Sequence, residues 1–342
     1  MGLIASAIFL VIIGGILNGS FAIPMKHMPH IKQEKLWFVF SWWAYLIIPI
    51  ATFLILDHNF INIILCVAPS YIYVPLLGGL LWGLGMICMC FAFKHIGIGV
   101  VFVINIGIGT AGGALLPLIF IHPNRFLTFF GLFIVAGVIL FIIGVISAGI
   151  AAKIRDDIKR TTLSNKNNLR PLLGIILSIL AGISSAFQGF SYAYSASGFQ
   201  TGKLLSSNSH LVVGNLPWLL IFLGGFLPYM IYFLIASLKR KSFGTTPDNR
   251  VSFKYHLMIF VMALLFFECA LFYGKATLLI GALGPIIIWP IYMVFIVLTS
   301  NFWSFKYGEW KGSSALSKSI MAFAISVQIV AVVILAYAAT LA

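Results

Sequence analysis

Charged residues are scarce in this sequence. Only 8% of the 342 residues are Asp, Glu, Lys or Arg, whereas 61% are apolar. A soluble protein of this length needs far more polar surface to cover its core. The scarcity therefore excludes an ordinary soluble enzyme. It indicates a membrane protein, and ten helical crossings of about 20 residues each would use nearly the whole chain.

Cysteines are also few and show no motif. Cys66, Cys88, Cys90 and Cys269 lie mostly in apolar segments without a CxxC pair, so we expect no disulfide framework, metal site or cofactor. The formal charge of +14 could suggest a nucleic-acid partner. The basic residues, however, lie in loops between apolar runs, so membrane orientation explains them better, and we expect lipids rather than nucleic acid as the surroundings.

Uncharged apolar runs predict an all-α membrane protein with ten transmembrane helices. The first run begins without a basic segment or cleavage site, so we interpret it as a span rather than a cleaved signal. The predicted spans are residues 3–23, 36–56, 72–93, 96–120, 126–150, 171–195, 211–236, 255–274, 277–300 and 316–341. The predicted organisation is a first five-helix repeat over residues 1–155, a basic cytoplasmic linker over 156–170 and a second repeat over 171–342.

The basic residues predict the orientation of the chain. Alternate loops, beginning with the one between the first two spans, hold 18 of the 21 Lys and Arg residues, and the other loops hold only Arg125, Lys203 and Lys275. Lys and Arg gather on the cytoplasmic side. We therefore expect both chain ends on the outer side of a cell inner (plasma) membrane.

The two halves look alike. Each has five predicted spans, a tight hairpin between its third and fourth spans, and a lysine near the hairpin tip, Lys94 or Lys275. Residues 15–21 and 182–188 share a pattern of small residues. An odd number of spans makes the second copy enter from the opposite face, so the sequence predicts an inverted five-plus-five repeat, as in many secondary transporters.

Glu268 is the most informative polar residue. It is the one acidic residue that the sequence places well inside a predicted span, about 10 Å of helix rise from Lys275. A carboxylate at that depth costs several kcal/mol unless it is paired, hydrated or protonated. We predict that Glu268 binds and releases a proton, with Lys275 as its charge partner. The alternatives are a Glu that only fixes helix packing and a Lys that extends to the interface.

A second group of candidates carries neutral hydrogen-bonding or aromatic side chains. Such groups suit a neutral, hydroxyl-bearing substrate, whereas ionic substrates usually require buried opposite charge. The alternative for each residue is a hydrogen bond between helices or an interfacial anchor. The predicted substrate-binding residues are Asn18, Ser20, Trp82, Asn105, Gln188, Tyr192, Asn215 and Trp289. Pro285 and Pro290 are expected to interrupt the ninth helix.

Four stretches of the sequence carry a family resemblance. The strongest runs over residues 78–117, from Gly78-Gly79-Leu80-Leu81-Trp82-Gly83-Leu84-Gly85 to Pro117, and the others are residues 22–26, 216–225 and 306–310. Together they resemble the L-rhamnose–proton symporters of the drug/metabolite transporter superfamily. The resemblance implies ten helices, an inverted repeat and proton-coupled sugar uptake.

Three functions compete. The first is proton-coupled uptake of a neutral hydroxyl-bearing solute, such as the sugar L-rhamnose. The second is export of a small amphipathic compound, which many aromatic spans would suit. The third is a membrane-embedded lipid-modifying enzyme, for which His27 and His30 near Glu34 are the sole candidate cluster. The first is preferred, and we expect no enzymatic activity.

Overall fold

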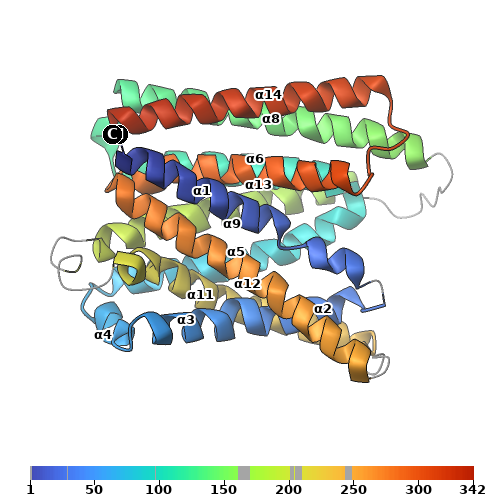
Figure 1. The fold of residues 1–342 in the computed structure, drawn as a ribbon, viewed down its shortest axis with the longest axis horizontal. Helices are drawn as coiled ribbons and strands as arrows, with labels where there is room; N and C mark the ends of the chain where they lie inside the picture. The colour runs from blue at the N-terminus through green and yellow to red at the C-terminus, as the bar shows by residue number, and fades with distance from the viewer. Residues whose placement is uncertain are drawn as a thin grey trace.

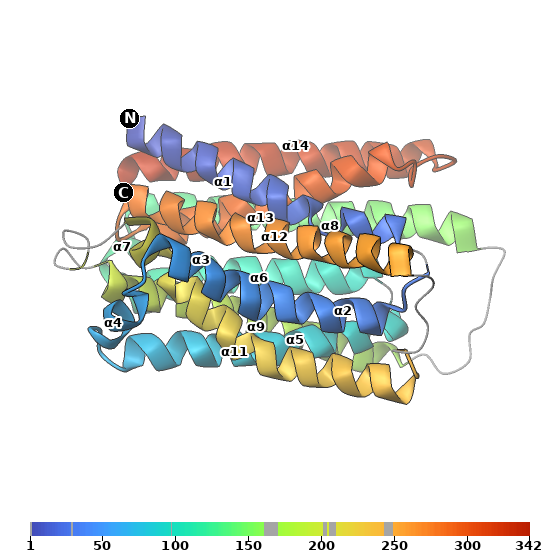
Figure 2. The ribbon, with the colours of Figure 1, turned by 60° about the horizontal axis from the view of Figure 1, so that its bottom comes forward.

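The computed structural model describes residues 2–28, 30–96, 98–160, 170–200, 204, 210–242 and 249–342. Over this part of the chain it is all helical, without a β-strand, and contains ten helices long and apolar enough to cross a membrane. These findings confirm the predicted number of spans. The helices form an elongated bundle (Figure 1), and both chain ends lie at the same end of it (Figure 2).

The first half begins with α1 (Gly2–Ser20) and the short helix η1 (Ile23–His27). The second span is divided into α2 (Gln33–Ser41), the π-helix η2 (Trp42–Ile47) and α3 (Ile48–Leu56). The remaining helices of this half are α4 (Phe60–Leu65), α5 (Ser70–Ile96), α6 (Ile98–Phe120), α7 (Pro123–Phe126) and α8 (Phe129–Arg160).

The second half consists of α9 (Pro171–Phe199), α11 (His210–Lys239), α12 (Asn249–Ile280), α13 (Gly284–Lys306), α14 (Ala315–Ala338) and η3 (Ala339–Leu341). These segments are apolar on all sides because one face contacts other helices and the other faces lipid. In hydrocarbon a helix is favoured since it satisfies its backbone hydrogen bonds internally.

Three local features differ from the predicted ones. Helix α8 continues to Arg160, beyond the predicted end of its span at residue 150, and residues 161–169 of the predicted linker lie outside the described residues. Helix α12 continues to Ile280, so Lys275 lies inside a helix and not at a hairpin tip. Helix α13 begins at Gly284 and has Pro285 in its first turn, where the missing N–H is not needed. The helix then continues through Pro290.

The packing of the helices fixes the interior. Helix α1 packs against α12 and α13, while α9 packs against α5 and α6; α8 and α14 pair with each other. Close approach of the helices depends on small residues. A Cβ atom on Gly79 would lie 1.9 Å from the carbonyl oxygen of Ile221, so the backbones of α5 and α11 nearly touch there.

The π-helix in the second span was not predicted. Residues 42–47 form it between two α-helical segments. Insertions of this kind are rare and are frequent at functional sites, because they turn one side chain away from the regular helical face. Here the buried side chain of Tyr45 is directed to the middle of the bundle, where it contacts rings from α5, α11 and α12.

Candidate functional site

Aromatic side chains form a continuous chain of ring contacts along the interior of the bundle. Neighbouring ring centroids lie 4.9 to 6.5 Å apart, within the range of favourable aromatic contacts. We call this set the aromatic column. It consists of Phe21, Trp37, Phe40, Tyr45, Trp82, Tyr192, Trp218, Phe222, Phe233, Phe266, Tyr273 and Trp289.

Beside the middle of the column lies a neutral hydrogen-bonded group from three helices. The amide Nδ2 of Asn18 on α1 donates to Tyr292 Oη on α13 at 2.7 Å and to Cys269 Sγ on α12 at 3.2 Å. Tyr292 Oη donates to Cys269 Sγ at 2.9 Å. We call Asn18, Cys269 and Tyr292 the polar triad. It brings donors and acceptors for hydroxyl groups next to the aromatic rings.

A second polar group lies where α9, α11 and α12 meet. Tyr192 Oη donates to the carbonyl of Gly214 at 2.9 Å and lies 2.9 Å from Thr277 Oγ1. Asn215 Nδ2 donates to the carbonyl of Leu211 at 2.9 Å. Asn215 Oδ1 and Trp218 Nε1 are buried, and neither has a hydrogen-bond partner among the described residues. Such atoms are costly unless a ligand or water satisfies them.

The two predicted tryptophans differ in how tightly their side chains are held by neighbouring helices. Trp82 is stacked on Phe266, with centroids 6.4 Å apart and an interplanar angle of 9°. Trp289 donates from Nε1 to the carbonyl of Gly109 at 3.1 Å and is 1% exposed. It also lies directly against Gly113, where a Cβ would meet its ring at 2.2 Å. Trp289 therefore fixes α13 to α6.

Three predicted residues belong neither to the aromatic column nor to the two polar groups beside it. Ser20 accepts a hydrogen bond from Trp303 Nε1 at 2.8 Å. The side chains of Asn105 and Gln188 make no hydrogen bond within the part of the chain that the structure describes, and Gln188 is buried. The structure thus places Asn18, Trp82, Tyr192, Asn215 and Trp289 in the aromatic column or its polar groups, but not these three.

Glu268 lies in the middle of α12 but on its outward face. It is 12 residues, or about 18 Å of rise, before the end of the helix at Ile280. Glu268 therefore lies deeper than predicted, because the helix continues beyond Lys275. Its stripe of the helix also carries Leu257 (50% exposed) and Val261 (38% exposed), whereas Phe266 and Tyr273 mark the inward face. Glu268 is partly buried, and no ion pair or hydrogen bond joins it to another described residue.

Lys275 lies on the same outward stripe, two turns beyond Glu268. It is exposed, and the structure contains no ion pair between the two side chains, both of which are described. The placement fits a lysine that extends to the membrane surface. Its role as the charge partner of Glu268 stays a prediction.

Several interior residues were missed from the sequence. Cys269 was interpreted as a small apolar residue, and Tyr45, Tyr273 and Tyr292 were not singled out. A signal existed on α12, because Phe266, Cys269 and Tyr273 follow the i, i+3, i+7 spacing of one helical face. The orientation of Tyr45 was not accessible, since it depends on the π-helix.

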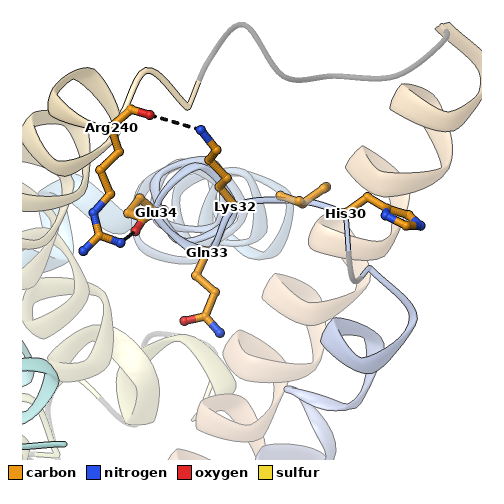
Figure 3. Close-up of a pocket in the computed structure, with 6 residues that line it drawn as sticks. His30, Lys32, Gln33, Glu34 and Arg240 are labelled. Atoms are coloured by element: carbon orange, nitrogen blue, oxygen red, sulfur yellow. Dashed lines mark hydrogen bonds and ion pairs between the residues drawn. The ribbon is translucent and has the colours of Figure 1, made fainter. Parts of the chain in front are cut away.

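One end of the bundle carries charged contacts and a pocket. We call it the basic end; α1 and α13 finish there, and α2 begins there (Figure 1). A pocket of about 490 Å³ at this end is lined by His30, Ile31, Lys32, Gln33, Glu34 and Arg240. In Figure 3 the Arg240 guanidinium donates to Glu34, while Lys32 Nζ donates to the carbonyl of Arg240 at 3.1 Å. It is a surface pocket of charged side chains, apart from the aromatic column.

The second charged group at this end centres on Glu309. Its carboxylate accepts from Lys26 Nζ at 2.6 Å and from Ser304 Oγ at 2.7 Å, and lies 3.5 Å from Arg155 Nη1. Partial burial alone would raise the pKa of Glu309. The hydrogen bonds from Lys26 and Ser304 and the positive charges of Lys26 and Arg155 outweigh it, and the pKa is lowered.

Comparison with known families identifies the class of this protein. Residues 2–340 match the sequence model of the family described as L-rhamnose-proton symport protein (RhaT). The chain belongs to this family. A search of curated proteins found no match. Since the family match covers nearly the whole chain, the protein is a multi-pass membrane transporter that couples sugar movement to protons, and not an enzyme.

The interior of this symporter suits such a substrate. A sugar presents C–H faces, which stack on aromatic rings, and hydroxyl groups, which require neutral donors and acceptors. The aromatic column offers rings for the C–H faces, and the polar triad offers donors and acceptors for the hydroxyl groups. Membership of a symporter family does not favour the exporter alternative.

Proposed function

We propose that the aromatic column is the path of the sugar and that the polar triad, together with Tyr192 and Asn215, binds its hydroxyl groups. The observation that carries this proposal is the juxtaposition of the column and the triad on α12, where Phe266 and Cys269 are separated by less than one turn. A neutral sugar such as L-rhamnose requires no counter-charge there. Trp82, stacked and close to the triad's helix, is the preferred ring for sugar contact.

The column is closed in this conformation. Tyr192 and Asn215 are 0% exposed and Trp218 is 5% exposed, so no sugar reaches them without movement of the helices. The unpartnered atoms Asn215 Oδ1 and Trp218 Nε1 favour a bound state in which hydroxyl groups satisfy them. Ser20, Asn105, Gln188 and Trp289 are kept as secondary candidates, because each contributes hydrogen-bonding capacity near the same helices.

Glu268 is proposed to carry the proton. Its position on the outward stripe of α12 separates it from the sugar path, so coupling would pass through the helix. The adjacent residue, Cys269, bonds to Asn18 and Tyr292, and a change in the position of α12 on protonation therefore alters the polar triad. Lys275, two turns further along the same helix, is proposed as the charge partner that stabilises the carboxylate form of Glu268.

The test is Glu268→Gln in reconstituted vesicles. One charge crossing 100 mV corresponds to about 2.3 kcal/mol, or some fifty-fold accumulation of a neutral solute. We expect the variant to lose accumulation driven by a pH gradient but to keep sugar exchange at zero gradient. Asp57→Asn, which changes an acid at the end of α3, is the matched control. Unchanged accumulation in Glu268→Gln would remove this residue from the mechanism.

We further propose that the fold is an inverted repeat of the drug/metabolite transporter type, with halves 1–155 and 171–342. In such a repeat α1 of the first half corresponds to α9 of the second, α5 corresponds to α12, and α6 corresponds to α13. The packing supports this relation, because α1 contacts α12 and α13 just as α9 contacts α5 and α6. Helices α8 and α14, which are related to each other, form a pair.

The same proposal sets the orientation. The basic end faces the cytoplasm, as the distribution of Lys and Arg favours, and both termini face outward across the inner membrane. Residues 156–170 then form a cytoplasmic connection. Lipids surround the exposed apolar side chains of the outer helices, and nucleic acid is not expected as a partner.

A further inference from the structure

The connection between α1 and α2 lies across the basic end of the aromatic column. We call its residues 21–28 and 30–32 the strap. Phe21 begins it and contacts the rings of Phe266 (5.1 Å between centroids), Phe40 (5.9 Å) and Trp37 (6.5 Å). Further along, Met28 is only 2% exposed and belongs to the main hydrophobic core. The strap thus covers the last rings of the column with apolar side chains.

Charged contacts fasten the strap at both of its ends. Near α1, Lys26 Nζ lies 2.6 Å from Glu309 Oε1 and 4.2 Å from the ring centroid of Tyr307. Near α2, Lys32 Nζ donates to the carbonyls of Arg240 at 3.1 Å and Lys241 at 3.5 Å. Next to this second fastening the Arg240 guanidinium is paired with Glu34 (Figure 3).

Both fastenings join the first half of the chain to the second. Lys26 and Lys32 belong to the connection between α1 and α2, and Glu34 lies in the first turn of α2. Their partners lie at the end of α11 and between α13 and α14. The Glu309 side is itself anchored, because Trp310 is buried between α8 and α14 and donates from Nε1 to Ser304 Oγ at 3.0 Å. The partner of Lys26 is therefore held in place by the packing of α8 against α14.

From this geometry we infer that the strap is the gate of the sugar path at the basic end, and that the Lys26–Glu309 and Lys32/Glu34–Arg240 contacts hold it shut. Opening requires these contacts to exchange for water. Exchange of the charged contacts is inexpensive, since Lys26 and Glu309 are 38% and 40% exposed. Opening also moves Phe21 and Met28 out of their apolar contacts. The inference rests on the proposed sugar path through the aromatic column, but not on the proton role of Glu268.

The native thiol of Cys269 offers a reporter. It is 2% exposed beside the middle of the column. Replacing Cys66, Cys88 and Cys90 with alanine leaves it as the single thiol in the full-length chain. A membrane-impermeant maleimide is then applied to vesicles from one side at a time. In a separate sample, Lys311→Cys in a fully cysteine-free chain identifies the side on which the exposed basic end lies.

We expect Lys26→Met and Glu309→Gln to raise the rate of Cys269 labelling from the basic-end side by about five-fold, the size expected when an exposed ion pair is lost. Lys26→Arg keeps the charge and should label at the original rate. Lys311→Met removes an exposed lysine that makes no ion pair among the described residues and is the matched control.

Two results would overturn the inference. One is an unchanged labelling rate in both Lys26→Met and Glu309→Gln. The other is an equal rise from both sides, which would indicate general loosening of the bundle rather than a gate. The assay uses neither sugar nor a proton gradient, so its outcome is independent of Glu268→Gln. Normal gate behaviour together with unchanged accumulation in Glu268→Gln would leave the gate standing and reject that proton carrier.

Discussion

The middle of the bundle and its basic end are closed by different forces. In the middle, buried rings contact each other and neutral groups form the hydrogen bonds. At the basic end, pairs such as Lys26–Glu309 are more than a third exposed. Water replaces the second kind of contact readily but cannot replace the first without a large loss of apolar burial.

The difference indicates what each region needs in order to open. The middle opens only if something restores the lost ring contacts and hydrogen bonds, and a sugar with C–H faces and hydroxyl groups does both. At the basic end water can replace the charged contacts, so only the apolar contacts of the strap remain to be broken. Selectivity should therefore reside in the aromatic column and the polar triad, whereas the charged contacts affect only the rate of opening.

The largest expected effect comes from separating two helices, α5 and α11, that pack closely in the middle of the bundle. Gly79→Ala places a Cβ 1.9 Å from the Ile221 carbonyl oxygen, so α5 and α11 must separate beside Trp82. We expect a loss of stability of about 1 to 3 kcal/mol and loss of sugar accumulation. Gly107→Ala in α6, where an added Cβ meets nothing within 4 Å, is the control. The melting temperature in detergent and sugar uptake check the prediction, and equal behaviour of the two variants would contradict it.

A smaller effect is expected within the polar triad. Tyr292→Phe removes the acceptor of the Asn18 amide and the donor to Cys269 while preserving the ring. Losing such neutral hydrogen bonds should weaken sugar binding about three- to ten-fold, because each contributes about 0.5 to 1.5 kcal/mol. Equilibrium sugar binding at two pH values measures it.

The control for this prediction is Tyr337→Phe on α14, an exposed ring with no hydrogen bond from its hydroxyl to a described residue. If Tyr292→Phe binds sugar as tightly as Tyr337→Phe does, selectivity does not reside in the triad. The comparison between the middle and the basic end would then lose its functional meaning, although the closed packing would remain.

The sequence was sufficient for the spans and insufficient for the orientation of side chains. Ten apolar runs determine ten helices because the bilayer leaves few alternatives. The facing of Glu268 was not predicted, since a residue within an apolar run can face lipid or the interior equally well when all sides are apolar. Comparison with Leu257 and Val261, both exposed in the structure, was needed to place it.

Local chain geometry was the other source of error. The end of α12 was placed near residue 274 because Lys275 resembles a loop residue, yet the helix continues to Ile280. A long side chain that extends along an exposed stripe permits a charge inside a helix. The π-helix at Trp42–Ile47 carries no composition signal, so the inward placement of Tyr45 could be obtained only from the coordinates.

The smallest expected effect concerns the pH dependence of the basic end. Because the pKa of Glu309 is lowered in the folded protein, its contribution to stability is complete above the ordinary pKa of a glutamate. That contribution is lost as the pH falls through the lowered value. The difference in melting temperature between the native chain and Glu309→Gln should thus be small and constant across neutral and mildly acidic pH, and should disappear only in strong acid. A difference that already disappears at mildly acidic pH would mean that the gate contacts respond to the protons that drive transport. The distinction between a pH-insensitive basic end and a substrate-selective middle would then have to be abandoned.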